Sequence, residues 1–599
     1  MIVITASLCR SHLQMIQVAR REGSNGDARA CSLAMLRTIK SLLLLMLLAA
    51  SSLSLPAGPL QAAQDSCREI KEHGLHPSVP PAAAQLCSLI EAGRLDELRW
   101  PDCSSYRAQV EKFYASNAFV LGWVQEGRPT PQAAAMIELF RAAEKKGLEP
   151  EDYDASRWTT RLQNLSISGQ TSQDVARFDF ALTVSALRYI SDLSQGRVAP
   201  TECQVNLPKK QFDGAAFLRN EVIHAADVRA GVEKIEPPYD AYRRTLAAFE
   251  WYLALARQGD GAALPAIRAS LRPGEPYAGV QQLAERLRQL GDLASGAAIP
   301  AAAIYQEPLV TALKRFQDRH GLLADGIIGR ATFEELNVPL SRRVTQLKLA
   351  LERWRWLPNN SGRQALVVNI PEFRLRAFDN QHVAFSMRAI VGQALEHQTP
   401  IFADEMEAII FRPYWNVPPS IQREELVPIL RRNPGYLAKH KMEVVNAKDE
   451  IVSIPAVDAK VLGQLTSGGL RIRQQPGPAN SLGLIKFVFP NQYGVYMHGT
   501  PQRELFYEDR RDFSHGCIRI EDPAALAGWV LRDRPEWTQK RILAAMGGKQ
   551  PVSVRLTAPI PVLILYTTAV IEENGEVRFL RDIYGNDAAL EKALAARRH

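Results

Sequence analysis

Hydrophobic positions divide the chain into a helical first half and a strand-rich second half. Between residues 64 and 275, apolar residues recur every three or four positions, as in 175–193 and 239–257, and this spacing lines one face of a helix. From residue 365 onward, short runs rich in Val, Ile and Phe alternate with turn residues. That pattern predicts a sandwich or barrel-like sheet rather than a doubly wound one. We therefore predict an α+β multidomain protein, and 599 residues suffice for about three to four domains.

A small three-helix module is predicted at 276–340, between these halves. Apolar residues at helical spacing mark one helix at 280–290 and a second at 309–316. An Ala-Asp-Gly-Ile-Ile-Gly turn follows at 324–329, where glycine suits tight backbone geometry. Thr332 is the predicted N-cap of the third helix.

The N-terminus has the pattern of an export signal. Arg37 and Lys40 precede an apolar run at 42–50, and small residues end at Ala63. The run is shorter than the roughly 20 residues that a membrane span needs. We expect residues 1–63 to be removed, with Met35 as a candidate start codon and an uncleaved anchor as the alternative. The mature protein would be exported, periplasmic or in the cell envelope, with no stable membrane span.

Composition and charge exclude some classes of protein. Hydrophobic residues make up 46% and charged residues 23%, which is ordinary for a globular protein and argues against extensive disorder. Loss of 1–63 removes six Lys/Arg and two Asp/Glu, so the net charge falls from +8 to +4. Because no basic stripe with interleaved aromatics is present, we expect no nucleic-acid partner.

Candidate catalytic residues cluster in two segments, Tyr-Met-His-Gly-Thr at 496–500 and Phe-Ser-His-Gly-Cys-Ile-Arg-Ile at 513–520. A cysteine acyl-transfer enzyme needs a thiolate nucleophile, an imidazole that takes its proton, and backbone N–H groups that hold the oxyanion. Apolar neighbours predict that both segments are strand ends at one rim of a sheet, with His498 facing Cys517. Two alternatives are a buried cysteine with packed histidines and a zinc site of His498, His515 and Cys517. The zinc set lacks a fourth ligand and the usual paired cysteines.

The cysteine count also singles out Cys517. Seven cysteines become five after signal removal, and export permits disulfides. Cys67, Cys87, Cys103 and Cys203 could form two bridges, whose connectivity the sequence does not determine. Cys517 would remain as an unpaired thiol, which indicates reactivity.

The two segments resemble the catalytic signature of the L,D-transpeptidases of bacterial cell-wall synthesis, in which His-Gly-Thr precedes Ser-His-Gly-Cys-hydrophobic-Arg. Val391-Gly392, Thr399-Pro400 and 415–421 resemble the same catalytic domain. The stretch 187–198 resembles the helical scaffold of large members. The module at 276–340 resembles the small peptidoglycan-binding domain, although a helical unit without a ligand is the alternative.

The resemblance implies a role for each candidate residue. Cys517 would be the nucleophile and His498 its base, with the imidazole lowering the thiol pKa to about 3.5–7.5. The Gly499 carbonyl would orient His498, and the N–H groups around Gly516 and Cys517 would hold the oxyanion. Arg519 would bind a stem-peptide carboxylate or form a structural ion pair. Ser514 and His515 would shape the site, and Tyr496 and Trp415 would form the cleft walls.

The implied reaction starts from a tetrapeptide stem of peptidoglycan. Cys517 would attack the carbonyl of its third residue, expel the terminal D-alanine and leave a thioester, which an amine of a second stem would resolve as a 3→3 cross-link. The partners would be stem peptides and glycan, and no metal or organic cofactor is required. Water or another amine as acceptor, and a non-catalytic wall-binding scaffold, are the alternatives.

The predicted domain order is as follows: 1–63 signal region, 64–275 helical scaffold, 276–340 peptidoglycan-binding domain, 341–364 helical linker, 365–550 catalytic domain and 551–599 C-terminal extension. The strand pattern stops at about 420–482. A long insertion before a catalytic segment is typically functional, so we expect a lid over the donor cleft, with a peripheral excursion as the alternative.

Overall fold

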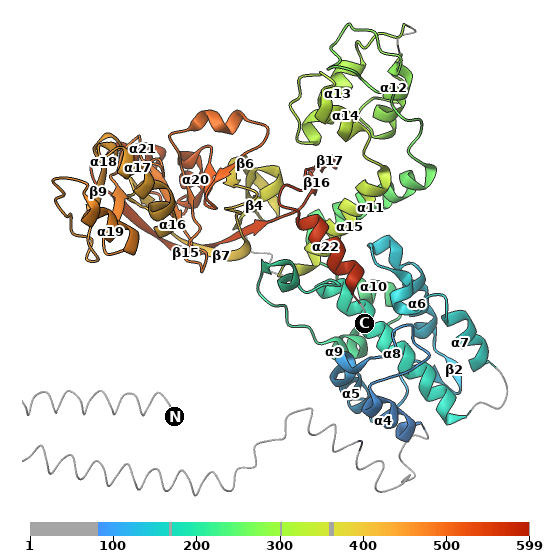
Figure 1. Ribbon diagram of the computed structural model, residues 1–599. Coiled ribbons are helices and arrows are strands. Elements are labelled where there is room, and N and C mark those ends of the chain that lie inside the picture. The colour runs from blue at the N-terminus through green and yellow to red at the C-terminus, as the bar shows by residue number, and fades with distance from the viewer. Residues whose placement is uncertain (1–66, 68–81, 167–170, 300–301, 359–363, 598–599) are drawn as a thin grey trace, which may run out of the picture.

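Three lobes make up the molecule in Figure 1. The computed structural model describes residue 67 and residues 82–166, 171–299, 302–358 and 364–597. A helical lobe, a small helical domain and a strand-rich lobe meet around helices α11, α15 and α22 (Figure 1). The predicted α+β class is confirmed, whereas the signal region and the candidate start codon lie outside the described residues.

The helical lobe is organised around one long buried helix. Helix α8 (Ser172–Gln195) starts at a capping box between Thr171 and Asp174 and ends at Gly196, and it contains the helical span predicted at 175–193. In its middle, the buried carboxylate of Asp179 accepts hydrogen bonds from the Tyr114 hydroxyl and from the Trp123 N–H, both at 2.7 Å. The other elements are α4 (Ala83–Ala92), α5 (Arg107–Ala115), β1 (Val124–Gln125), β2 (Arg128–Pro129), α6 (Pro131–Arg141), α7 (Trp158–Leu165), β3 (Val205–Asn206), α9 (Gly214–Phe217), α10 (Val228–Glu233) and α11 (Asp240–Gln258).

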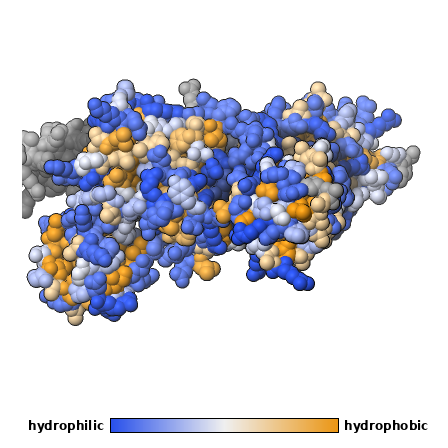
Figure 2. All heavy atoms as spheres, turned by 90° about the horizontal axis from the view of Figure 1, so that it is seen from above, coloured by the Kyte–Doolittle hydropathy of each residue, from blue (hydrophilic) through white to orange (hydrophobic). Residues whose placement is uncertain are grey.

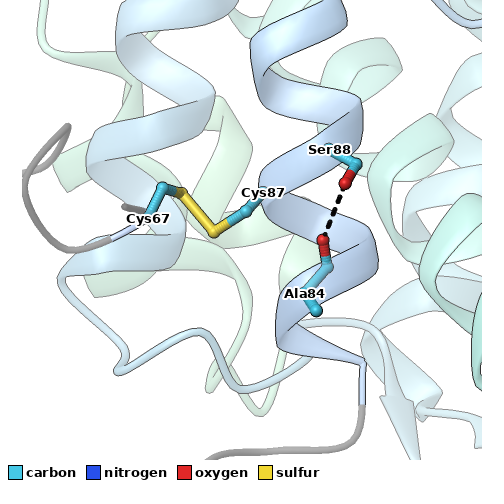
Figure 3. Close-up of a disulfide and its surroundings, with 4 residues drawn as sticks. All are labelled: Cys67, Ala84, Cys87 and Ser88. Atoms are coloured by element: carbon cyan, nitrogen blue, oxygen red, sulfur yellow. Dashed lines mark hydrogen bonds between the residues drawn. A yellow bond between two sulfur atoms is a disulfide. The ribbon is translucent and has the colours of Figure 1, made fainter. Parts of the chain in front are cut away.

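One disulfide joins Cys67 to Cys87 on helix α4, with the two Cα atoms 5.5 Å apart (Figure 3). Cys103 and Cys203 are free thiols, one buried and one half-buried. The expectation of two bridges among these four cysteines is therefore wrong for the structure.

The small helical domain contains the three predicted helices, α12 (Val280–Gln289), α13 (Leu309–Arg319) and α14 (Arg330–Leu336). Gln317 fixes the turn before α14, because its amide group donates to the Asp325 carboxylate at 3.0 Å and accepts from the Gly326 N–H at 2.8 Å. Thr332 lies inside α14 and accepts a hydrogen bond from the same amide. The predicted N-cap at Thr332 is wrong, since Gly329 occupies that position. Helix α15 (Leu340–Trp356) continues the chain to the strands.

The strand-rich lobe contains a ten-stranded sheet in the described part of the chain. Nine strands follow the order β11-β12-β14-β6-β5-β4-β15-β7-β3, and the tenth, β13, pairs with β6 beside this path. Because β7 also pairs with β11, the sheet closes on itself. Inward-facing aliphatic and aromatic residues form its core. The elements are β4 (Gln364–Asn369), β5 (Arg374–Asp379), β6 (His382–Gly392), β7 (Ile401–Phe411), β11 (Ile485–Val488), β12 (Met497–His498), β13 (Asp512–Ser514), β14 (Ile518–Ile520), α20 (Pro523–Val530), α21 (Gln539–Gly547) and β15 (Val552–Leu565).

The predicted lid region is a small subdomain with its own apolar core. Strands β8, β10 and β9 form a separate three-stranded sheet in it, although the sequence pattern predicted no strands here. Buried Gln422 connects the helical part of this subdomain to the segment that leads into β10. Its amide donates to the carbonyls of Leu465 and Leu470 and accepts from the Ile472 N–H. The elements are β8 (Trp415–Asn416), α16 (Pro419–Ile421), the π-helical turn Gln422–Leu426, α17 (Val427–Arg432), α18 (Tyr436–Lys439), β9 (Met442–Val445), α19 (Ala459–Ser467) and β10 (Arg471–Gln474).

The C-terminal segment belongs to the sheet rather than extending from it. Strand β15 runs between β4 and β7, parallel to the first and antiparallel to the second. The expected boundary at 550 is therefore wrong for the structure. After a hairpin of β16 (Ala569–Ile571) and β17 (Val577–Phe579), helix α22 (Asn586–Ala596) returns to the helical lobe, where Arg597 forms an ion pair with Asp192 at 2.8 Å.

Hydrophilic residues cover most of the face in Figure 2, with hydrophobic ones in scattered groups. None of the helices in the described ranges is long and apolar enough to span a bilayer.

Candidate active site

Strands β12 and β14 bring the two predicted catalytic segments together. They are parallel neighbours, with Met497 opposite Ile518 and His498 opposite Arg519. Met497 and Ile518 are fully buried in the core. Because side chains alternate along a strand, His498 and Arg519 lie on the other face, and so does Cys517 immediately before β14.

A tight turn presents Cys517 at the start of β14. Gly516 has a φ of +102°, a conformation that other residues seldom adopt. Buried Ser514 stabilises the turn, because its hydroxyl donates to the Cys517 carbonyl and accepts the Gly516 N–H at 3.2 Å. The Gly516 N–H is thus already engaged, which leaves the Cys517 N–H as the remaining oxyanion donor among those expected.

His498 is a buried, neutral imidazole. Its Nδ1 lies 2.6 Å from the Gly499 carbonyl oxygen. Burial and the nearby Arg519 charge lower its pKa to about 3. A carbonyl oxygen only accepts hydrogen bonds, so Nδ1 carries the ring proton and Nε2 has a free lone pair at neutral pH. The ring is therefore in the tautomer that a general base requires.

Gly483 allows the chain to pack against the backbone that holds His498. It has a φ of +63°, and a Cβ there would lie 2.7 Å from the Gly499 carbonyl carbon. Any side chain would push away the carbonyl that orients the imidazole.

The Cys517 thiol is half-buried and neutral at rest. Burial raises its pKa, although hydrogen bonds from Tyr496 and the charges of Lys486 and Arg519 oppose the rise. Its sulfur lies 3.9 Å from the Gly494 carbonyl oxygen, and no hydrogen bond joins it to His498 in the described part of the chain. The expectation that the imidazole lowers the thiol pKa is wrong for this structure, because desolvation outweighs the neighbouring charges.

Two cations lie beside the thiol without a carboxylate partner. Lys486 is opposite His498 on β11, so it shares this face, and its Nζ lies 3.7 Å from the centre of the Tyr496 ring. Arg519 donates to the Gln502 side chain at 2.8 Å. Within the described ranges neither forms an ion pair with an acidic side chain, so two unpaired positive charges lie beside the thiol. From the sequence, two roles were open for Arg519, binding a stem-peptide carboxylate or forming a structural ion pair. Among the described residues Arg519 forms no such ion pair.

Tyr496 connects the thiol to the lid subdomain. Its ring centre is 5.6 Å from that of His498. Burial and the nearby Cys517 raise the pKa of its phenol, and Trp415 opposes the rise. Trp415 lies on β8, which pairs with β10 of the lid. The two predicted wall residues are therefore in contact beside the thiol.

His515 points away from this group. Its Nε2 lies 2.7 Å from a carboxylate oxygen of Glu425 in the lid, and its ring centre lies 4.7 Å from that of His397, with the two rings tilted by 43°. His498, His515 and Cys517 do not converge, and the described residues contain no cluster of three or more His, Cys, Asp or Glu that could hold a metal. The zinc alternative is not supported.

Sequence reasoning missed Lys486, Gln502 and Glu425. For Lys486 a signal existed, because a lysine between Ile485 and Phe487 in a strand must face away from the core. The contacts of Gln502 and Glu425 depend on tertiary packing, and their local sequence gives no such signal.

Comparisons with known proteins identify the domains. Residues 363–554 match the family model for the L,D-transpeptidase catalytic domain, residues 108–249 match a scaffold domain, and residues 276–336 match a "Putative peptidoglycan binding domain". A curated protein of Haemophilus influenzae named "Putative L,D-transpeptidase" is 30% identical over 278 residues, which are 45% of this chain and 55% of that protein. The chain thus matches about half the length of this relative. These matches confirm the resemblance stated from the sequence.

A solved structure of an L,D-transpeptidase from Xylanimonas cellulosilytica is 15% identical and covers 50% of this chain and 99% of its own, with a TM-score of 0.15. A score this low adds nothing to the sequence matches.

Proposed function

Because this chain carries an L,D-transpeptidase catalytic domain and a peptidoglycan-binding domain, we propose that it forms 3→3 cross-links between peptidoglycan stem peptides through a thioester on Cys517. The observation that carries this proposal is the common face of β11, β12 and β14. It places a thiol, an imidazole with a free Nε2 and two cations together.

In the first step, the Cys517 sulfur attacks the carbonyl carbon of the third stem residue while His498 Nε2 takes the thiol proton. The buried imidazole is a weak base, so the proton transfer accompanies the attack instead of preceding it. Lys486 and Arg519 stabilise the negative charge on sulfur and on the carbonyl oxygen, and the Cys517 N–H donates to that oxygen.

The intermediate then collapses. The peptide C–N bond breaks, His498 returns its proton to the amine of the leaving D-alanine, and the acyl group remains on sulfur as a thioester. The terminal carboxylate of the donor would bind Arg519, whose guanidinium has no acidic partner in the described structure.

In the second step, the side-chain amine of a diamino acid on another stem attacks the thioester carbon. The new C–N bond forms and the C–S bond breaks, while His498 takes a proton from this amine and passes it to the departing sulfur, which restores the thiol. The three-helix domain would hold the glycan nearby, which raises the effective concentration of stems at the thiol.

The lid favours a transferase over a hydrolase. Its Trp415 and Glu425 contact the segments that flank Cys517, and covering the thioester would exclude water. Water as acceptor would make the protein an L,D-carboxypeptidase, and another amine would attach a protein to the wall.

Mass analysis of muropeptides tests these acceptors. The full-length protein and a Cys517→Ala variant are incubated with a disaccharide tetrapeptide. Cross-linked dimers that have lost one D-alanine, formed only by the unmodified protein, support the proposal. Tripeptide monomers alone indicate hydrolysis, and unchanged substrate with both proteins indicates a non-catalytic scaffold.

A further inference from the structure

We propose that a cleft between the three-helix domain and the catalytic sheet binds carboxylate groups of a peptidoglycan strand, as a second binding site away from Cys517. This inference rests on the proposed function for the identity of its ligand. The cleft has a volume of about 670 Å³. One wall includes Gln317, Asp325 and Thr332 around the turn before α14, and the other includes Arg374, Arg388 and Arg511 of the sheet.

Arginines outnumber acidic residues in the lining of the cleft, eight to five. Three of the arginines, Arg330, Arg388 and Arg510, also form ion pairs with carboxylates outside the lining. One carboxylate neutralises several of the arginines only in part. Buried Glu372 contacts the guanidiniums of Arg376 at 2.7 Å, Arg374 at 3.5 Å and Arg578 at 3.9 Å.

Arg511 shows most directly that negative charge is lacking. In the described ranges it has no carboxylate within ion-pair distance, and it donates to the carbonyl oxygen of Glu508 at 2.6 Å and more distantly to those of Glu372 and Phe373. Burial and the neighbouring Arg388 and Arg374 lower its pKa to about 10. Three guanidiniums near one another in a partly desolvated cleft are stabilised by a bound anion.

The chemistry of the arginines indicates the class of ligand. A guanidinium binds planar carboxylates and phosphates through paired hydrogen bonds. Stem peptides carry several carboxylates, and a strand held by the three-helix domain would place them opposite Arg374 and Arg388. Glu508 and Asp509 also line the cleft and would repel an anion at their side, so the ligand is expected on the side of Arg374 and Arg388.

Arg374 and Arg388 are suitable for a test because their side chains are 35% and 41% exposed. The double variant Arg374→Gln/Arg388→Gln removes two charges from the cleft. The matched control is Arg555→Gln, whose side chain is 84% exposed on β15 and lines no part of the cleft.

The experiment is isothermal titration of a disaccharide tetrapeptide into full-length protein with Cys517→Ala in every sample, so that no turnover occurs. We expect the parent protein to bind the ligand at two sites, the donor site at Arg519 and the cleft. The double variant should bind at least tenfold more weakly at the cleft with the donor site unchanged, and the control should change neither affinity more than twofold. The same ligand with amidated carboxylates should bind both proteins equally and weakly. Equal affinities of the double variant and the parent protein would overturn the proposal, and so would inorganic phosphate binding as tightly as the tetrapeptide.

A second readout separates this site from the proposed function. With the thiol present, the double variant should turn over a short free tetrapeptide within twofold of the parent rate but show a raised KM for glycan-linked stems. A parent protein that turns over neither substrate would contradict the proposed function, whereas the titration would still decide on the cleft. An unchanged KM for glycan-linked stems would contradict the role of the cleft alone.

Discussion

Tyr496 lies next to Cys517 across the β12–β14 pair, and its phenol lowers the pKa of the thiol, against the effect of burial. Strand pairing fixes this relationship, because the Ile518 N–H donates to the Tyr496 carbonyl at 3.1 Å. The phenol therefore stabilises the thiolate form of a thiol whose pKa burial raises.

Removing this hydroxyl should slow the thiol's chemistry. We expect Tyr496→Phe to raise the pKa of Cys517 further and to reduce its alkylation rate at neutral pH about three- to tenfold, since one hydrogen bond contributes about 0.5–1.5 kcal/mol. Iodoacetamide labelling followed by site-resolved mass spectrometry over pH 6–10 measures this rate. In both proteins the rate should still rise above pH 8. A plateau below pH 7 in the unmodified protein would instead show a stable thiolate–imidazolium pair.

Burial of neutral His498 should make the protein less stable in acid. An exposed histidine in the unfolded chain has a pKa near 6.5, against about 3 in the folded protein. Below pH 6.5 the unfolded chain therefore binds a proton that the folded protein does not, and the free energy of unfolding falls until the pH reaches about 3. From pH 7 to pH 5 this loss amounts to about 2 kcal/mol.

Denaturant unfolding at the two pH values, compared between the unmodified protein and His498→Gln, isolates this contribution. The variant should lose about 2 kcal/mol less than the parent on acidification. His382→Gln is the control, because that side chain is 78% exposed. The same pH dependence in parent and His498→Gln would show that His498 is not held neutral by the fold.

The two left-handed glycines Gly483 and Gly494 offer a matched pair of substitutions. Both have positive φ, but a Cβ at Gly494 meets nothing within 4 Å, whereas one at Gly483 clashes with Gly499. We expect Gly494→Ala to cost about 1 kcal/mol of stability from backbone strain. Gly483→Ala should cost more and also lower kcat at least tenfold, because the carbonyl that orients His498 moves. Equal kcat values for the two variants would contradict this role of Gly483.

The contact between Glu425 and His515 should influence substrate binding more than chemistry. It links the lid to the turn before Cys517 but touches neither His498 nor the thiol. A partly exposed contact between a carboxylate and an imidazole contributes at most about 1 kcal/mol, so Glu425→Gln should raise KM up to about fivefold with kcat unchanged. Glu424→Gln, next to it in the lid, should leave both constants unchanged. Steady-state kinetics with a tetrapeptide donor would measure them, and a fall in kcat alone for Glu425→Gln would refute the assignment.

The spacing of apolar residues along the chain was enough to predict those helices and strands in which that spacing is regular. The strands around 365–391 and helix α8 have clear periodicity and end at turn residues or glycine. Strands β9 and β10 were missed because each has only four residues and includes charged ones, Glu443 in β9 and Arg471 and Arg473 in β10. Strand β15 was assigned to an extension because its pairing with β4 joins residues far apart in the sequence.

The same distinction applies to the site. His498 and Cys517 are recognisable from their neighbours in the chain, and the strand pairing agrees with the sequence expectation. The neutral resting thiol could not be predicted, because burial is a property of the folded environment. Glu425 reaches His515 from 90 positions away in the chain, and no local pattern predicts such a contact.

The most direct test of the central claim is the mass of the intact protein during turnover of a tetrapeptide donor without acceptor. If Cys517 is the acyl carrier, the mass increases by that of the donor minus D-alanine, peptide mapping places the adduct on Cys517, and Cys517→Ala shows no increase. An adduct on another residue, or cross-link formation by Cys517→Ala at the parent rate, would contradict the account.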